Sequence, residues 1–194
     1  MNSCIKKQIA ESITIKQIIS SDDKIIKEIE SVSLEIINAY KRGNKTIIAG
    51  NGGSAADAQH ISAELVGKYN FKRPSLASIS LTTNSSILTA IGNDYGFDEI
   101  FSRQIEGNGI AGDVFLGIST SGNSKNIIEA LKECKKKDII TVGLTGKSGG
   151  EMNNYCDYCI KIPSDETPRI QETHILISHI ICSIVEEAIF DNDK

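Results

Sequence analysis

The chain has 194 residues, of which 40% are hydrophobic and 24% are charged, so it is long enough for one soluble globular domain with a sizeable core. Its formal net charge of -4 argues against a nucleic-acid-binding surface, which is usually basic. No apolar run reaches the roughly 18–20 residues of a membrane span, and the charged N-terminal stretch lacks the apolar core of a signal peptide, so we expect a cytoplasmic protein without a membrane or nucleic-acid partner.

Residues 1–43 are predicted to form helices. Isoleucine, leucine and valine recur mostly at steps of three or four residues in this segment. The polar residues 20–22 divide it, with Ser21 or Asp22 capping the second helix, and Gly43 ends that helix. Because these helices precede the first strand, they cannot connect two parallel strands, and we expect them to pack against a second subunit.

The rest of the chain alternates between short and long apolar segments, which indicates a parallel sheet with helices on both faces. Strands are predicted at residues 45–49, 76–81, 114–119, 139–144 and 158–162. Helices are predicted at residues 55–66, 84–91, 98–106, 123–136 and 169–190. We therefore expect a single domain over residues 1–194, in which the N-terminal helices (1–43) precede a three-layer αβα core (44–194) with a five-stranded parallel sheet.

The first predicted strand leads into a glycine-rich turn, Gly50-Asn51-Gly52-Gly53, and Ser54 follows as the predicted N-cap of the next helix. The free backbone N–H groups at such a helix start attract anions. His60 and Glu64 are four residues apart on this helix, so an imidazole and a carboxylate share one face about two turns from that start. Strand, turn and helix together predict an anion site with an acid–base pair on the same helix.

The third predicted strand leads into a run rich in hydroxyl groups, Ser119-Thr120-Ser121-Gly122-Asn123-Ser124, which ends at another helix start. Hydroxyls, free amides and the helix dipole together suit a phosphate group. The run matches neither the phosphate loop of nucleotide-binding proteins nor the dinucleotide fingerprint, so we expect the phosphate of a small molecule. The alternative is a turn whose serines and threonine only cap the helix.

Two other polar stretches are candidates for ligand binding. Asn93 and Asp94 follow a predicted helix and suit sugar hydroxyls, although a plain loop of turn-forming residues explains them equally. Gln171 and His179 are eight residues apart, about 12 Å along a straight helix, whereas metal bonds to nitrogen or oxygen are about 2.0–2.2 Å long. Either Gln171 lies in an irregular first turn, or the two residues serve different sites or different subunits; a single helical histidine is also often structural.

The five cysteines are an odd and scattered set, which favours reduced thiols. Cys156 and Cys159 form a C-x-x-C pattern, but one such pair is weak support for a zinc site. No predicted helix starts there, as a thioredoxin-like site would require. We therefore interpret the cysteines as structural thiols.

Five segments, taken in order, carry a specific resemblance: GNGGSAADAQHISAEL, IGNDYGFDEIFSRQIE, GDVFLGISTSGNS, VGLTGKSGG and TPRIQETHILISH. The set resembles the phosphoheptose isomerases of the sugar-isomerase (SIS) domain family over nearly the whole chain. The resemblance implies a flavodoxin-like SIS fold and a ketose–aldose isomerase that converts sedoheptulose 7-phosphate to D-glycero-D-manno-heptose 7-phosphate. It also implies a homotetramer with active sites at subunit interfaces, and a role in heptose synthesis for bacterial lipopolysaccharide, capsule and related surface glycans.

The resemblance also assigns site residues. It implies one zinc ion per subunit, with ligands that match His60, Glu64, Gln171 and His179. It implies that Glu64 is the base and His179 the acid of an enediol mechanism. Substrate contacts would come from Asn51, Gly52, Gly53, Ser54, Glu64, Asn93, Asp94, Ser119, Thr120, Ser121, Ser124 and Gln171, of which the four from the serine-rich run would bind the phosphate.

Two positions depart from the common pattern of that family. Lys68 stands where many relatives carry arginine, which loses a bidentate grip on phosphate or hydroxyls, and Pro168 stands where some carry aspartate. Both bear on sugar specificity more than on the type of reaction. An alternative is a non-catalytic adaptor of the same fold that binds the replication initiator DnaA; such an adaptor would be expected to lack the pair Glu64 and His179.

Overall fold

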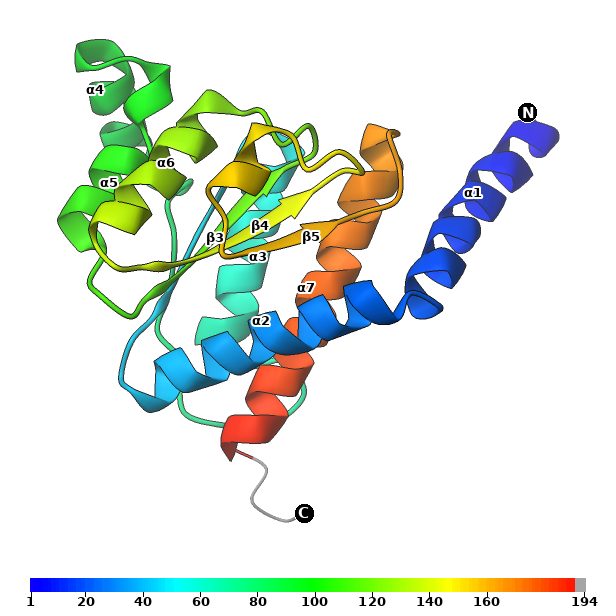
Figure 1. Ribbon diagram of the computed structural model, residues 1–194, viewed down its shortest axis with the longest axis horizontal. Helices are drawn as coiled ribbons and strands as arrows, with labels where there is room; N and C mark the ends of the chain where they lie inside the picture. Colours follow the sequence, from blue (N-terminus) through cyan, green and yellow to red (C-terminus); the bar gives the residue numbers. More distant parts are fainter. Residues whose placement is uncertain (191–194) are drawn as a thin grey trace.

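The computed structural model describes residues 1–190, and within them five parallel strands lie between two layers of helices (Figure 1). The strand order is β2-β1-β3-β4-β5. The strands are β1 (Thr46–Gly50), β2 (Ser78–Ser80), β3 (Val114–Ser119), β4 (Ile140–Thr145) and β5 (Tyr158–Lys161). This confirms the predicted three-layer fold with a five-stranded parallel sheet; the expected end of the domain at residue 194 lies outside the described residues.

Helices cover both faces of the sheet, as predicted. On one face α2 (Asp23–Lys41), α3 (Gly53–Val66) and α7 (Thr167–Phe190) enclose a core that contains Val32, Ile61 and Ile177. On the other face α5 (Ser102–Asn108) and α6 (Lys125–Lys136) enclose a second core, and α4 (Ser85–Asp94) lies at its margin. Every residue of β1 and β3 is buried, which explains why these strands appear as continuous apolar runs rather than alternating ones.

The N-terminal segment forms two helices, α1 (Asn2–Ser20) and α2, as predicted. The carboxylate of Asp22 accepts hydrogen bonds from the backbone of Lys24 and Ile25, which identifies Asp22 rather than Ser21 as the N-cap. Gly43 follows the end of α2 with a φ of 83°, the left-handed conformation that commonly ends a helix. The predicted division and the predicted end of this segment are therefore confirmed.

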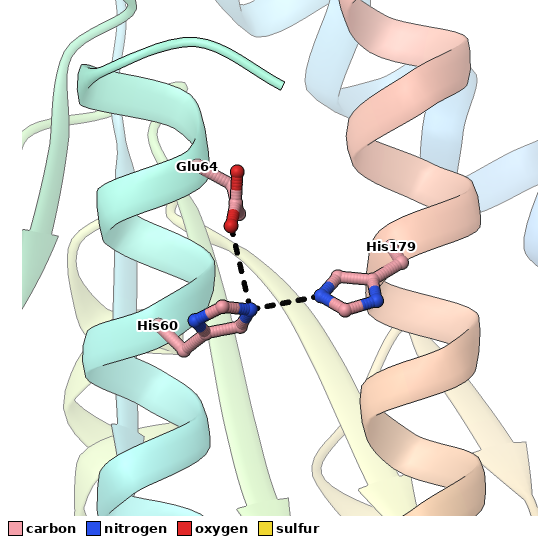
Figure 2. A group of neighbouring side chains, drawn as sticks. All are labelled: His60, Glu64 and His179. Carbon is pink, nitrogen blue, oxygen red and sulfur yellow. Dashed lines mark hydrogen bonds and ion pairs between the residues drawn. The ribbon is translucent and has the colours of Figure 1, made fainter. Parts of the chain in front are cut away.

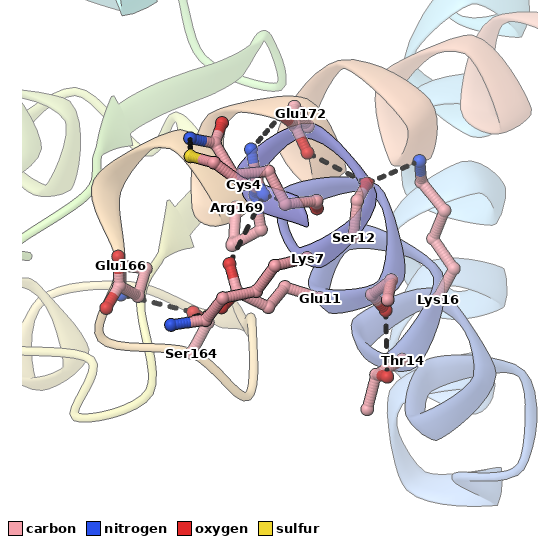
Figure 3. Close-up of polar contacts among 12 residues, drawn as sticks. Cys4, Lys7, Glu11, Ser12, Thr14, Lys16, Ser164, Glu166, Arg169 and Glu172 are labelled. Atoms are coloured by element: carbon pink, nitrogen blue, oxygen red, sulfur yellow. Dashed lines mark hydrogen bonds and ion pairs between the residues drawn. The ribbon is translucent and has the colours of Figure 1, made fainter. Parts of the chain in front are cut away.

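Helix α1 extends away from the sheet and contacts the rest of the chain mainly at the start of α7 (Figures 1 and 3). Arg169 donates to the backbone carbonyl of Gln8 over 2.7 Å and to the carboxylate of Glu172 over 2.6 Å. Ser12 donates to the other oxygen of Glu172 over 2.9 Å. These polar contacts fix one side of α1, while its isoleucines Ile5, Ile9, Ile13 and Ile18 are exposed in the single chain.

Two local predictions were wrong. Ser54 is not the N-cap of α3: Gly52, with a φ of 56°, holds that position, and Ser54 is buried inside the first turn. The helix predicted over 98–106 is broken into a 3-10 turn, Phe97–Glu99, and α5, because Ile100 and Phe101 between them both turn into the core. Strand β2 is also shorter than the predicted 76–81, as an edge strand often is.

Contrary to the expectation from the sequence, α7 is long and apolar enough to cross a membrane by length and composition alone. Its buried residues include Ile170, Ile177, Ile181 and Val185, which pack in the core beneath α2 and α3. A helix that is apolar on several sides is expected in the centre of a protein core. Packing within the protein therefore explains the apolar character of α7.

Candidate active site

Two loops meet at the carboxyl edge of the sheet, between β1 and β3. These strands are neighbours, but the helices that follow them, α3 and α6, cover opposite faces, so the loops open between them as in other doubly wound sheets. Asn51 of the glycine turn and Asn126 of α6 exchange two amide hydrogen bonds of 2.9 Å each. The structure therefore brings the two predicted anion sites side by side; Asn126, which clamps them, had no signal in the sequence.

The serine loop, residues 119–124, groups its hydroxyls closely. The oxygen of Ser119 lies 2.8 Å from that of Ser124 and 3.5 Å from that of Ser121. Ser124 is the N-cap of α6, yet its side chain makes no capping hydrogen bond to the helix. Capping alone therefore does not explain these hydroxyls, which face one another beside the first backbone N–H groups of α6. This arrangement suits a phosphate oxygen cluster.

The loop after β4 braces the serine loop from behind. Gly146 donates its N–H to the carbonyl of Thr120 over 3.0 Å, and Met152 donates to the carbonyl of Gly122 over 2.9 Å. Gly122 has a φ of 68°, and a Cβ on it would collide with the backbone of Gly149. The sequence analysis used the glycines after β4 only as part of a family resemblance; the structure shows that they make room for the serine loop.

Gly122→Ala is expected to lower the free energy of unfolding by roughly 1–3 kcal/mol, because alanine disfavours a positive φ and its methyl group meets backbone rather than a movable side chain. Affinity for a phosphate ester should fall with it. Gly107→Ala in α5, where a Cβ meets no heavy atom within 4 Å, is the matched control and should be neutral or stabilising. Urea unfolding and calorimetric titration measure both quantities; equal behaviour of the two variants would contradict the role of the brace.

A second group of polar side chains lies between α3 and α7 (Figure 2). His60 and Glu64 of α3 and His179 of α7 point toward one another. The Nε2 atoms of the two histidines are 2.9 Å apart, and Nε2 of His60 is 3.4 Å from Oε1 of Glu64. The side chains of His60 and Glu64 are 48% and 23% exposed, so the cluster opens to solvent in the single chain. The spacing of His60 and Glu64 was predicted; the structure adds His179.

This cluster fits a divalent metal ion by its donor set. Two imidazole nitrogens and one carboxylate oxygen converge, and the three ligand atoms lie within 4.8 Å of one another. Zinc binds nitrogen and oxygen ligands at about 2.0–2.2 Å, so ligand atoms at these separations can reach one ion with small side-chain adjustments. His174, one turn before His179, is not part of it: burial lowers the pKa of His174 to about 4, and its Nε2 donates to the carbonyl of Thr145.

Gln171 does not join this cluster within one chain. Helix α7 is continuous from Thr167, so the predicted irregular first turn is wrong. The Gln171 amide lies beside the glycine turn, where its Nε2 would be 2.8 Å from a Cβ on Gly53. Gly53 is two turns of α3 before His60. The position of Gln171 suits contact with a ligand at the glycine turn, and a bond from Gln171 to a metal in the cluster requires another subunit.

The remaining predicted substrate residues are distributed along the carboxyl edge. Gly52 and Gly53 are exposed at the glycine turn, whereas Ser54 is buried. Asn93 and Asp94 are exposed at the end of α4, where the amide of Asn93 donates to the carboxylate of Asp94 over 2.8 Å. Helix α4 packs on the 3-10 turn at Phe97–Glu99, far from α7 in Figure 1. Within one chain the structure does not bring Asn93 and Asp94 to the histidine cluster.

A buried ion pair below the cluster had no signal in the sequence. Nε of Arg73, in the loop after α3, donates to Glu186 of α7 over 2.8 Å, and its other nitrogens donate to the carbonyls of Glu64 and Leu65. Burial opposes ionisation of Glu186, but hydrogen bonds from the Asn70 and Tyr69 backbone and from Arg73 outweigh it, and the pKa of Glu186 lies below its ordinary value. Arg73 thus ties the end of α3 to α7 and sets the separation of Glu64 from His179.

Comparisons with known proteins agree with this geometry. Residues 13–146 match the SIS domain family. The protein of Campylobacter jejuni named phosphoheptose isomerase 2 is 63% identical over 190 residues, which cover 98% of this chain and 94% of that relative. The phosphoheptose isomerase of Aneurinibacillus thermoaerophilus is 60% identical over 192 residues, which cover 99% of this chain and 97% of the relative.

Solved structures with the same name share the fold along their whole length. A phosphoheptose isomerase from Neisseria gonorrhoeae superposes with a TM-score of 0.90 at 41% identity, covering 96% of this chain and 98% of its own. One from Francisella tularensis superposes with a TM-score of 0.92 at 34% identity, covering 95% and 97%. The chain therefore belongs to the SIS domain family, in the group of its members that are named phosphoheptose isomerase.

Proposed function

We propose that the chain is a ketose–aldose isomerase that converts sedoheptulose 7-phosphate to D-glycero-D-manno-heptose 7-phosphate. The observation that carries this proposal is the cluster of Glu64 and His179, in which a carboxylate and an imidazole face the same space between two helices. Relatives at 60% identity and above carry the name of that activity. The serine loop supplies the hydroxyls and amides that a sugar phosphate needs.

The isomerisation moves one proton between neighbouring carbons through an enediol. Glu64 takes the proton from C1 of the ketose and returns it to C2. His179 donates and accepts a proton at the sugar oxygens, which also assists opening of the sugar ring. A positioned acid–base group of this kind typically accelerates such a step by about 10²–10⁴-fold. The phosphate stays at the serine loop during these transfers, which holds the reacting carbons in place.

His60, Glu64 and His179 are the residues that would hold zinc, with Gln171 of another subunit as a fourth ligand. When bound, zinc supplies Lewis-acid polarisation of a carbonyl oxygen and stabilises negative charge on it. A carboxylate bonded to a metal ion is a weaker base. Glu64 therefore has to loosen from the metal, or share it, when the substrate binds.

A homotetramer with interfacial active sites would complete this site. The cluster is open to solvent in one chain, and Gln171, Asn93 and Asp94 lie apart from it. The isoleucines exposed along α1 offer an apolar surface that a second copy would cover. The enzyme would act in the cytoplasm and supply heptose for bacterial surface glycans. The alternative of a non-catalytic adaptor lacks support, because the acid–base pair is present and the relatives at 60% identity and above carry the isomerase name.

Removal of the metal is expected to abolish most of the turnover of sedoheptulose 7-phosphate, and added zinc should restore it. The measurement is product formation together with metal content on one sample, before and after chelation. Activity that is indifferent to chelation would remove zinc from the mechanism but keep the isomerase. No turnover by a metal-replete tetramer would contradict the proposed reaction, and a DnaA binding assay would then test the adaptor.

A further inference from the structure

Two thiols that the proposed function does not use lie together at the edge of the sheet. Cys156 is in the turn before β5, and Cys159 is on β5, paired with Gly143 of β4. A Cβ on Gly143 would lie 2.7 Å from the sulfur of Cys156 and 3.6 Å from that of Cys159. The missing side chain of Gly143 therefore leaves one space that both sulfur atoms occupy, and the thiol of Cys156 hydrogen-bonds to Cys159. Both thiols are free.

The surroundings of this pair do not supply a metal site. Within residues 1–190, ligand atoms of three or more histidine, cysteine, aspartate or glutamate residues converge at the cluster of His60, and not here. The carboxylate of Asp157 accepts from the backbone and hydroxyl of Thr141, and that of Glu28 accepts from the backbone of Cys159. A structural zinc needs four ligands, so the chemistry left to two neighbouring thiols is that of disulfide formation.

The two thiols are unequal. The hydrogen bond from Cys156 is the largest influence on Cys159; with a hydrogen bond from Thr145 and the charge of Lys161 it outweighs burial and lowers the pKa of Cys159 to about 7. The same hydrogen bond and burial raise the pKa of Cys156. Thiol–disulfide exchange is fastest when the attacking thiol has a pKa near the ambient pH. Cys159 is therefore the attacking thiol and Cys156 the resolving one.

A cavity of about 420 Å³ gives small molecules access to both sulfur atoms. Three ammonium groups line it, those of Lys24, Lys147 and Lys161. Its three carboxylates, those of Asp22, Glu28 and Asp157, already accept hydrogen bonds from the chain. The lysines are thus available to a ligand, which favours one that carries carboxylates.

We propose that Cys156 and Cys159 are a dithiol that exchanges with low-molecular-weight disulfides bearing carboxylates. The thiolate of Cys159 attacks one sulfur of the small disulfide, which expels the other half as a thiolate and leaves a mixed disulfide on Cys159. Cys156 then loses its proton and attacks the sulfur of Cys159, which expels the second half and forms the Cys156–Cys159 disulfide. Two protein thiols are oxidised, and one small disulfide is reduced to two thiols.

The test uses the native full-length chain in excess glutathione disulfide, followed by acid quenching and peptide mass spectrometry. The peptide that contains Cys156 and Cys159 should lose two hydrogens, and reduced glutathione should restore them. Cys134 and Cys182 are buried thiols with raised pKa values and should stay reduced as internal controls. If Cys156 and Cys159 also stay reduced while the exposed Cys4 gains glutathione, the proposal is wrong.

Two variants test the roles of the thiols. Cys156→Ser should trap glutathione on Cys159, whereas Cys159→Ser should leave Cys156 with at least tenfold less adduct under the same conditions. Equal trapping in both variants would overturn the assignment of the attacking thiol. None of these readouts involves a sugar phosphate, so their outcome is independent of the proposed isomerase activity.

Discussion

Glu64→Gln is expected to lower turnover of sedoheptulose 7-phosphate by about 10²–10⁴-fold, which is the usual contribution of a positioned general base. Glutamine keeps the size of the side chain and an oxygen that can face His60, but it cannot take a proton from C1. The phosphate group would be held at the serine loop after β3, on a different element from Glu64. Affinity for a phosphate ester should therefore be nearly unchanged.

Three measurements separate loss of the base from other effects. Assays in saturating zinc keep weakened metal binding from being mistaken for loss of the base. Substrate recovered from deuterated water should carry no deuterium at C1 in the variant, whereas the unchanged protein should exchange that proton. Glu187→Gln removes the same charge from an exposed carboxylate on α7, next to Ser183, and should leave turnover unchanged. Equal loss of ester affinity and turnover in Glu64→Gln would contradict its assignment as the base.

The fold could be predicted because its signals are local. Buried strands give continuous apolar runs, and the strand, turn and helix around Gly50 can be recognised from neighbouring residues. The N-cap prediction failed for a reason that is not local. A Cβ on Gly50 would meet the backbone of Ser54 at 2.5 Å, so the turn is too tight for Ser54 to stand outside the helix. The cap position then falls to Gly52, which accepts a positive φ.

The candidate site could be predicted only in part, for the same reason. His60 and Glu64 are four residues apart, so helix geometry alone places them together. His179 is 119 residues from His60, and their contact depends on how α3 packs against α7. The ion pair that fixes this packing joins residues 113 positions apart, and both look like ordinary surface charges in the sequence. The family resemblance indicated His179, but nothing in the residue pattern indicated Arg73 or Glu186.

Arg73→Met is expected to lower the free energy of unfolding by roughly 3–5 kcal/mol, because it leaves the buried carboxylate of Glu186 without its charged partner. The side chains of Arg73 and Glu186 are only 1% and 0% exposed. Arg73→Lys restores the charge but not the planar set of donors that reaches Glu186 and the carbonyls of Glu64 and Leu65 together, so stability should return only in part. Lys136→Met breaks an exposed ion pair with Glu133 and should leave stability unchanged.

Denaturant unfolding measures these changes, and its pH dependence tests their origin. The folded protein holds the pKa of Glu186 below its ordinary value of about 4.3, so its contribution to stability is complete above that pH and is lost as the pH falls through the folded-state pKa. Arg73→Met should weaken this acid dependence. If Arg73→Met were no more destabilising than Lys136→Met, the ion pair would not hold α3 against α7. The distance between Glu64 and His179 would then have to be set by apolar packing alone, and zinc affinity should be equal in Arg73→Met and the unchanged protein.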